Sequence, residues 1–232
     1  MIHTELRTLL LQKEDCFNDI LGQQNTKQQL KSALISGRHI IILGPPGIGK
    51  TTLAKNVAKL LPPVTIEEDG KMVTKKGAER FVRVQGSPDL TAEDLLGDID
   101  PIKALQFGPL SEEAFTPGKI FRANQGILFF DELNRCPEKL QNALLQVLEE
   151  GKVTIGSYMV DFETNFVLIA TMNPKDTNTE KLSQVLLDRF DVVYMTHPET
   201  VALEQKIVKL KGEDLGVVFP EHLLHYCIGF IH

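Results

Sequence analysis

The segment HIIILGPPGIGKTTLAK, residues 39–55, restricts the possible folds more than any other part of this chain. Four apolar residues lead into a turn with three glycines and two prolines, and a helix-forming run follows. Glycines let a backbone fold closely around an anion and point its N–H groups inward, and the start of a helix adds the positive end of its dipole. The segment therefore predicts a strand, an anion-binding turn and a helix, in that order.

The same segment matches the pattern G-x-x-x-x-G-K-[ST], which requires a strand before it and a helix after it. In that setting Lys50 can reach the β- and γ-phosphates of a nucleotide, and the Thr51 hydroxyl can join a Mg²⁺ shell. A chance match is expected in roughly 1% of chains of this length, so a Gly-rich turn without a ligand is the weaker interpretation. We predict ATP and Mg²⁺ as ligands and expect Lys50 to face solvent. The predicted loop residues are Gly44, Pro45, Pro46, Gly47, Ile48, Gly49, Lys50, Thr51 and Thr52.

A pair of acids follows another apolar run, in GILFFDELNR. Parallel strands deliver side chains to a crevice at their carboxyl ends, so Asp131 and Glu132 are expected near the loop. Asp131 would hold Mg²⁺, and Glu132 would orient and polarise an attacking water. The alternative is that both acids simply open the next helix, where its dipole favours them.

Five short apolar runs predict one parallel sheet with helices on both faces, which is an α/β fold with αβα layers. The runs are HIIIL, FVRVQ, ILFFD, FVLIAT and VVYM. A Gly- and Pro-rich stretch at about 98–125 interrupts the alternation and is expected outside the sheet. The segment at 152–162 alternates like a β-hairpin, and the chain becomes helical after Pro198.

Composition narrows the range of partners. A formal net charge of −6 over 232 residues gives no general electrostatic reason to expect nucleic acid or an anionic membrane as a partner. The three cysteines, Cys16, Cys136 and Cys227, form no C-x-x-C pair. No signal peptide or spanning run is recognisable, so a cytoplasmic protein without a membrane partner is expected.

These motifs carry a resemblance. GPPGIGKTT, ILFFDELNR, FVLIATMNP and LLDRFDVV, in this order, resemble the AAA+ ATPases. More narrowly, the chain is similar to the MoxR and magnesium-chelatase I-subunit group in RVQGSPDLTAEDLLGDID, FTPGKIFRANQGILFFDELNR and LLQVLEEGKVTI. The resemblance implies a P-loop NTPase αβα sandwich, a small helical lid, Mg-dependent ATP hydrolysis, and a hexameric-type ring in which each site is completed by a neighbouring subunit.

The resemblance also implies a division of the chain. Residues 1–17 would form an N-terminal helix, residues 18–196 the ATPase domain, and residues 197–232 part of the lid. Within the ATPase domain, the segment at about 98–125 corresponds to the helix-2 insertion, and the one at 152–162 to the hairpin before the sensor strand.

Individual residues take roles from the same resemblance. Ile20 and Gly22, in FNDILGQQ, would lie near the adenine base. Asn173 matches the sensor-1 position, and Arg189 matches the arginine finger that enters the neighbour's site. Gln85 lies where some relatives place a polar switch that holds the catalytic glutamate inactive. Without the family these last three would be interpreted as a turn initiator, a helix-end cation and a polar group at a strand end.

The lid of the group carries a second sensor arginine, whereas no Lys or Arg follows Lys211 here. The apolar end LLHYCIGFIH favours a truncated lid over a protein that lacks this sensor. The same end holds His222, His225 and Cys227, but their spacing matches no common zinc pattern, so we expect them to pack rather than bind metal.

Three functions are compatible with the resemblance. The first is a MoxR-like ATPase that remodels or activates a protein partner, in relatives often one with a von Willebrand A-type domain. The second is the ATPase motor of a magnesium or cobalt chelatase. The third is a nucleic-acid motor like the replicative helicases, which the hairpin KVTIGSYMVDFE disfavours because it offers one Lys and two acids. We expect the first.

Overall fold

The computed structural model describes most of the chain. The described ranges are 2–12, 15–68, 71–108, 111–155, 158–173, 182–218 and 220–231.

A five-stranded parallel sheet forms the centre of the molecule, as the five apolar runs predicted. Across the sheet the strands are β11 (Phe190–Tyr194), β1 (His39–Leu43), β10 (Val167–Met172), β7 (Ile127–Asp131) and β4 (Phe81–Gln85). The loop after β1 and the acids after β7 therefore leave the same edge of the sheet, with the end of β10 between them.

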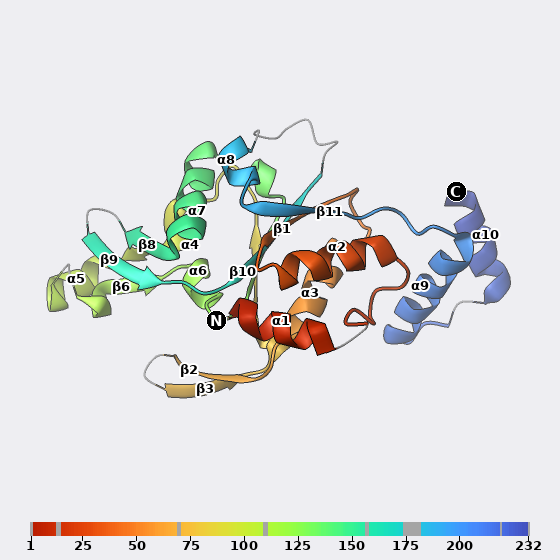
Figure 1. Ribbon diagram of the computed structural model, residues 1–232, viewed down its shortest axis with the longest axis horizontal. Coiled ribbons are helices and arrows are strands. Elements are labelled where there is room, and N and C mark those ends of the chain that lie inside the picture. The colour runs from red at the N-terminus through yellow and green to blue at the C-terminus, as the bar shows by residue number, and fades with distance from the viewer. Residues whose placement is uncertain are drawn as a thin grey trace.

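Helices cover both faces of this sheet (Figure 1). Apolar residues line both faces of the buried strands, so that Ile40 and Ile42 join one hydrophobic cluster and Ile41 joins the other. The first cluster includes side chains of α1 (Ile2–Gln12), α2 (Gln24–Ile35) and α3 (Lys50–Leu60). The second includes side chains of α4 (Ala92–Leu96), α6 (Lys119–Arg122), α7 (Glu138–Glu150) and α8 (Gln184–Leu187). The three layers predicted from the sequence are confirmed.

Within the described ranges, three small antiparallel pairs lie outside the central sheet. They are β2 (Val64–Glu68) with β3 (Lys71–Lys75), β5 (Gly97–Ile99) with β6 (Phe115–Pro117), and β8 (Lys152–Ile155) with β9 (Tyr158–Glu163). The helix α5 (Pro101–Phe107) lies between β5 and β6 and buries none of its residues. Short 3₁₀ helices complete the set: η1 (Gly77–Arg80), η2 (Glu112–Ala114) and η3 (Leu133–Arg135).

The β2–β3 pair was not predicted from the sequence. The strand β3 has no buried residue, and its apolar side chains Met72 and Val73 are 70% and 38% exposed. A strand without a buried face loses the apolar alternation by which strands are recognised. The pair Asp69-Gly70 is the sequence signal that could have found it.

The last two helices, α9 (Val201–Asp214) and α10 (Glu221–Ile231), pack against each other beside the layered body (Figure 1). Thr200 caps α9 by accepting a hydrogen bond from the Leu203 N–H, 3.2 Å away. Leu203 also lies so close to Gly22 that a Cβ there would come 2.4 Å from Leu203 Cδ2. Among the described residues, no helix is both long and apolar enough to cross a membrane.

Candidate functional site

The loop after β1 has the backbone of a phosphate-binding turn. Gly47 and Gly49 have φ of 78° and 94°, a conformation that L side chains rarely adopt, and α3 begins directly after them. Gly44 is required for a different reason: a Cβ there would come 2.4 Å from the Met195 carbonyl oxygen. The loop therefore needs its glycines for backbone shape and for close packing.

Contrary to our expectation, the Lys50 side chain does not extend into solvent. Its Nζ donates hydrogen bonds to the carbonyl oxygens of Gly44 and Pro45, at 2.6 and 2.8 Å, and the residue is half-buried. Burial lowers the pKa of Lys50, while the nearby charges of Asp131 and Glu132 act to raise it. The loop carbonyls hold the ammonium group because a partly buried cation needs hydrogen-bond acceptors. The negative charges of Asp131 and Glu132 also act on this group.

Thr171 of β10 holds the two acids in different ways. Its buried hydroxyl donates to Asp131 Oδ1 at 2.7 Å and accepts the Glu132 N–H at 2.9 Å. Glu132 has φ of 56°, so the chain turns sharply between the two acids. Asp131 ends β7, whereas Glu132 stands before η3. The neighbouring acids thus have separate surroundings, which separate roles require.

Two residues of β4 and one of η3 are further partners of the acids. Gln85 Nε2 donates to Glu132 Oε2 at 2.9 Å, and Arg135 Nη1 lies 3.1 Å from the same oxygen. Arg83 Nη2 donates to Asp131 Oδ2 at 2.6 Å. Sequence reasoning singled out Gln85 but missed Arg83, Arg135 and Thr171.

Gly86 was missed too, although it shapes the same corner. Its N–H donates to the Asp131 carbonyl at 2.6 Å, and a Cβ at Gly86 would come 2.1 Å from the Glu132 carbonyl oxygen. Only glycine fits there without displacing the acids. A glycine at the end of a predicted strand was the available signal.

The donor set fits a magnesium ion that is also bound by a nucleotide. Mg²⁺ prefers oxygen ligands and is usually held by one or two protein groups together with substrate phosphates. Asp131 supplies a carboxylate whose side chain is 17% exposed, and Thr51 supplies a hydroxyl in the first turn of α3. Among the described residues, no group of three or more His, Cys, Asp or Glu side chains could hold a metal. His225 instead bonds Gln205 through Nδ1, at 2.8 Å.

Three other predicted site residues have the following places in the fold. Asn173 follows β10 directly, two residues after Thr171. Ile20 is buried in the cluster of α1, α2 and α3, and Gly22 lies against α9. The roles of these three residues toward a nucleotide remain proposals.

Arg189 lies at the opposite end of the sheet from the loop of its own chain. It precedes Phe190, which pairs with the first residue of β1, whereas the loop follows the last residue of β1. A strand of this length spans about 16 Å, farther than an arginine side chain reaches. Its Nη2 donates instead to Glu149 Oε1, near the end of α7. Arg189 therefore cannot complete the site of its own chain.

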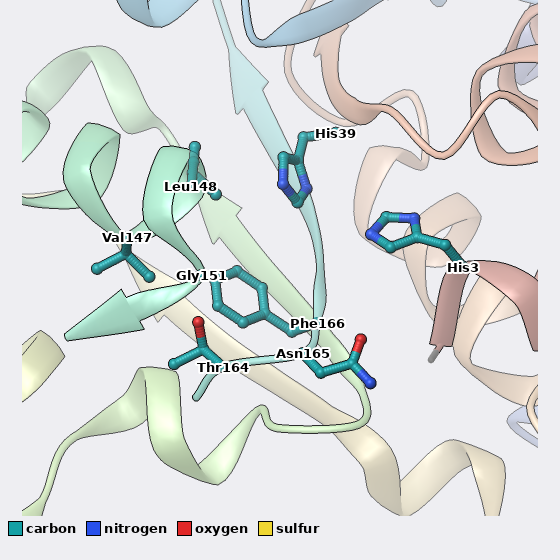
Figure 2. A pocket seen from close by; sticks show the side chains of 8 residues that line it. All are labelled: His3, His39, Val147, Leu148, Gly151, Thr164, Asn165 and Phe166. Carbon is teal, nitrogen blue, oxygen red and sulfur yellow. The ribbon is translucent and has the colours of Figure 1, made fainter. Parts of the chain in front are cut away.

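A pocket of about 170 Å³ lies at this same far end of the sheet (Figure 2). His39 begins β1 with its ring between those of His3 and Phe166, at centroid distances of 5.7 and 6.2 Å. Its Nδ1 accepts the Leu168 N–H at 3.1 Å, and burial lowers the pKa of His39 to about 3. The pocket is separate from the loop and the acids.

Taken with this geometry, comparisons with known proteins define the class. The parallel sheet and the phosphate loop beside an acidic pair are those of an AAA+ ATPase of the MoxR and magnesium-chelatase group. A family model described as magnesium chelatase, subunit ChlI, matches residues 16–179. The chain belongs to this family.

Several curated relatives are similar over three quarters or more of the chain. Competence protein ComM of Haemophilus influenzae is 32% identical over 197 residues, covering 75% of this chain and 38% of the relative. Magnesium-chelatase subunit ChlI of Olisthodiscus luteus is 32% identical over 186 residues, covering 75% and 54%. Protein YeaC of Bacillus subtilis is 30% identical, covering 80% and 51%. The chain thus spans about half the length of these relatives or less.

Solved structures show the same fold. A complex of the BchI and BchD subunits of magnesium chelatase matches with a TM-score of 0.66 at 24% identity, covering 91% of this chain and 70% of that one. NtrX from Brucella abortus, solved with ADP, matches with a TM-score of 0.55 at 19% identity, covering 86% and 43%.

Proposed function

We propose that this chain binds ATP and Mg²⁺, hydrolyses ATP as one subunit of a ring, and uses the energy to remodel or activate a protein partner. The observation that carries the ATPase proposal is that the glycine loop with Lys50 and the acidic pair leave the same edge of the parallel sheet, from β1 and β7 on either side of β10. A glycine turn, a cation and two acids at one edge of a sheet are the parts that phosphoryl transfer needs.

In this proposal each residue has one task. The loop N–H groups and Lys50 bind the phosphates, which Lys50 reaches by exchanging the carbonyls of Gly44 and Pro45 for phosphate oxygens. Thr51 and Asp131 would hold Mg²⁺, which neutralises charge on the phosphate oxygens when bound. Glu132 orients a water molecule and takes its proton as the water oxygen bonds to the terminal phosphorus, while the bond from that phosphorus to the bridging oxygen breaks and ADP leaves. Asn173, as sensor 1, contacts the same water.

A first test replaces the loop lysine. We expect Lys50→Ala to weaken the binding of a fluorescent ATP analogue by about 100-fold or more, because charge-assisted hydrogen bonds to the phosphates are lost. Lys55→Ala, an exposed position on the same helix, is the matched control and should bind normally. Unchanged affinity in a folded Lys50→Ala protein would contradict the assignment of the loop.

The partner is the second part of the proposal. Ring assembly and an action on a protein, such as one with a von Willebrand A-type domain, rest on the resemblance to the MoxR group. The BchI and BchD complex is a structural neighbour in which such a subunit assembles with another protein. Capture with Glu132→Gln, which should hold ATP without turnover, tests this part, with Lys50→Ala as the control that cannot load ATP.

Family membership favours a second candidate, the ATPase motor of a magnesium or cobalt chelatase. The two candidates differ in the process that ATP hydrolysis drives. A chelatase motor would support metal insertion into a porphyrin when combined with the other chelatase subunits. Capture of a partner unrelated to chelatases, without support of metal insertion, would favour remodelling.

A further inference from the structure

The edge strand β4 places two polar side chains beside the acids. Successive residues of a strand point to opposite faces, so Arg83 and Gln85 share one face. In register, Gln85 stands opposite Asp131 and Arg83 opposite Phe129. Strand pairing therefore fixes both side chains next to the end of β7.

These side chains form a continuous chain of contacts between the acids. Arg83 Nη2 donates to Asp131 Oδ2 at 2.6 Å and to Gln85 Oε1 at 3.1 Å. Gln85 Nε2 donates to Glu132 Oε2 at 2.9 Å. An arginine only donates and a carboxylate only accepts, so this pair of neighbours determines the orientation of the Gln85 amide.

We propose that Arg83 is a positioning residue that competes with Mg²⁺ for Asp131 and, through Gln85, couples Asp131 to Glu132. This inference rests on the proposed function, in which Asp131 serves the metal and Glu132 the water. Binding of Mg²⁺ with nucleotide displaces Arg83 from Asp131 Oδ2, and the Gln85 amide then loses one of the two contacts that orient it toward Glu132.

The burial of the two partners favours this competition. The Thr171 hydroxyl already uses one lone pair of Asp131 Oδ1 and Arg83 uses one of Oδ2, so Arg83 and the metal's shell draw on the same carboxylate. The Arg83 side chain is 53% exposed, so it can turn into water without leaving a buried charge unpaired. The Asp131 side chain is only 17% exposed, so a cation at close range stabilises its negative charge more strongly than it would stabilise a carboxylate in open solvent.

The test measures binding rather than turnover alone. A fluorescent, non-hydrolysable ATP analogue is titrated with Mg²⁺ for the unmodified protein, Arg83→Ala, Arg83→Lys and the control Arg7→Ala, an exposed arginine of α1. Arg83→Ala should bind the analogue at a Mg²⁺ midpoint about threefold to tenfold lower, because a partly exposed ion pair no longer competes. Arg83→Lys, which keeps the charge, should have a Mg²⁺ midpoint close to that of the unmodified protein. Arg7→Ala should show no change in the midpoint.

A second measurement tests the coupling through Gln85. Arg83→Ala should change kcat for ATP, and this change should disappear in a Gln85→Ala background while the shift in the Mg²⁺ midpoint persists. Equal kcat effects of Arg83→Ala in both backgrounds would overturn the coupling.

Two results would overturn the competition. One is an unchanged Mg²⁺ midpoint in an Arg83→Ala protein that melts like the unmodified one. The other is weaker analogue binding without Mg²⁺, which would mean that Arg83 contacts the phosphates itself. Failure of the unmodified protein to bind the analogue at all would overturn the proposed function together with this inference.

Discussion

At the scale of single residues, one buried hydroxyl separates two neighbouring acids. The Thr171 hydroxyl donates a hydrogen bond to Asp131 Oδ1 and accepts one from the Glu132 N–H, which holds the Asp131 side chain. The Glu132 side chain instead contacts Gln85 and Arg135. The left-handed backbone of Glu132 makes this possible, because an extended residue would continue the strand. Separate surroundings lead us to expect separate effects when each acid is neutralised.

We expect Glu132→Gln to keep Mg·ATP bound but slow turnover by roughly 10²–10⁴-fold, the usual share of a general base. Asp131→Asn should instead raise the Mg²⁺ concentration needed for nucleotide binding. Binding titrations and steady-state hydrolysis measure the two effects, with Glu138→Gln, an exposed acid at the start of α7, as the control. Equal losses of ATP affinity in both variants would argue against separate roles.

At the scale of elements, β1 connects two different environments. Its last residue leads into the phosphate loop, while its first residue, His39, lies near the rings of His3 and Phe166 (Figure 2). The ring of Phe190 also lies near it, at a centroid distance of 6.3 Å. His39 stays neutral there, because burial and the charges of His3 and Arg38 all lower its pKa. The pKa of His3 is lowered as well, again mainly by burial. This end of the strand therefore makes stability depend on pH.

The direction of the pH effect is set by proton uptake. With a pKa lowered from 6.5 to about 3, the folded His39 stays unprotonated while the unfolded chain takes up a proton below about pH 6.5. The free energy of unfolding should thus fall by about 1.4 kcal/mol between pH 7.5 and 5.5 from this residue alone. Urea unfolding at both pH values measures it. His39→Phe should flatten the dependence, whereas His197→Asn, an exposed histidine, should not. An equally steep dependence in His39→Phe would contradict the prediction.

At the scale of the whole molecule, the two ends of the sheet carry complementary groups. The loop and the acids lie at the carboxyl ends of the strands, and Arg189 lies before β11 at the other end, paired with Glu149. A single chain cannot bring these groups together, but two chains can. This is the arrangement that a ring with an arginine finger in trans requires.

Mixing two inactive variants tests this arrangement. Arg189→Ala should bind ATP normally and hydrolyse it roughly 10³–10⁵-fold more slowly, because a finger stabilises the transition state and not the bound substrate. Combining it with Lys50→Ala should restore part of the activity, since some interfaces then pair an intact loop with an intact finger. Specific activity of the unmodified protein should also rise with its concentration. If mixed oligomers form and stay inactive, Arg189 acts only structurally.

The sequence by itself determined the parts that depend on local pattern. Five largely apolar runs became the five strands of the sheet, because a strand covered on both faces is mostly apolar. The phosphate loop was recognisable because its glycines are required by backbone conformations within one short segment. Asp131 and Glu132 were found because they directly follow four apolar residues, which the structure buries in β7.

Only the tertiary structure decided which side chains meet the acids. Arg83 and Thr171 come from two different strands, and no spacing along the chain relates them to the acids, whereas Arg135 lies only three residues after Glu132. Gln85 was expected from the resemblance, but its contact with Glu132 depends on the register of β4 against β7 and on the left-handed turn at Glu132. Register and backbone turns arise from packing between distant segments, so they bring together residues whose positions in the sequence carry no signal of contact.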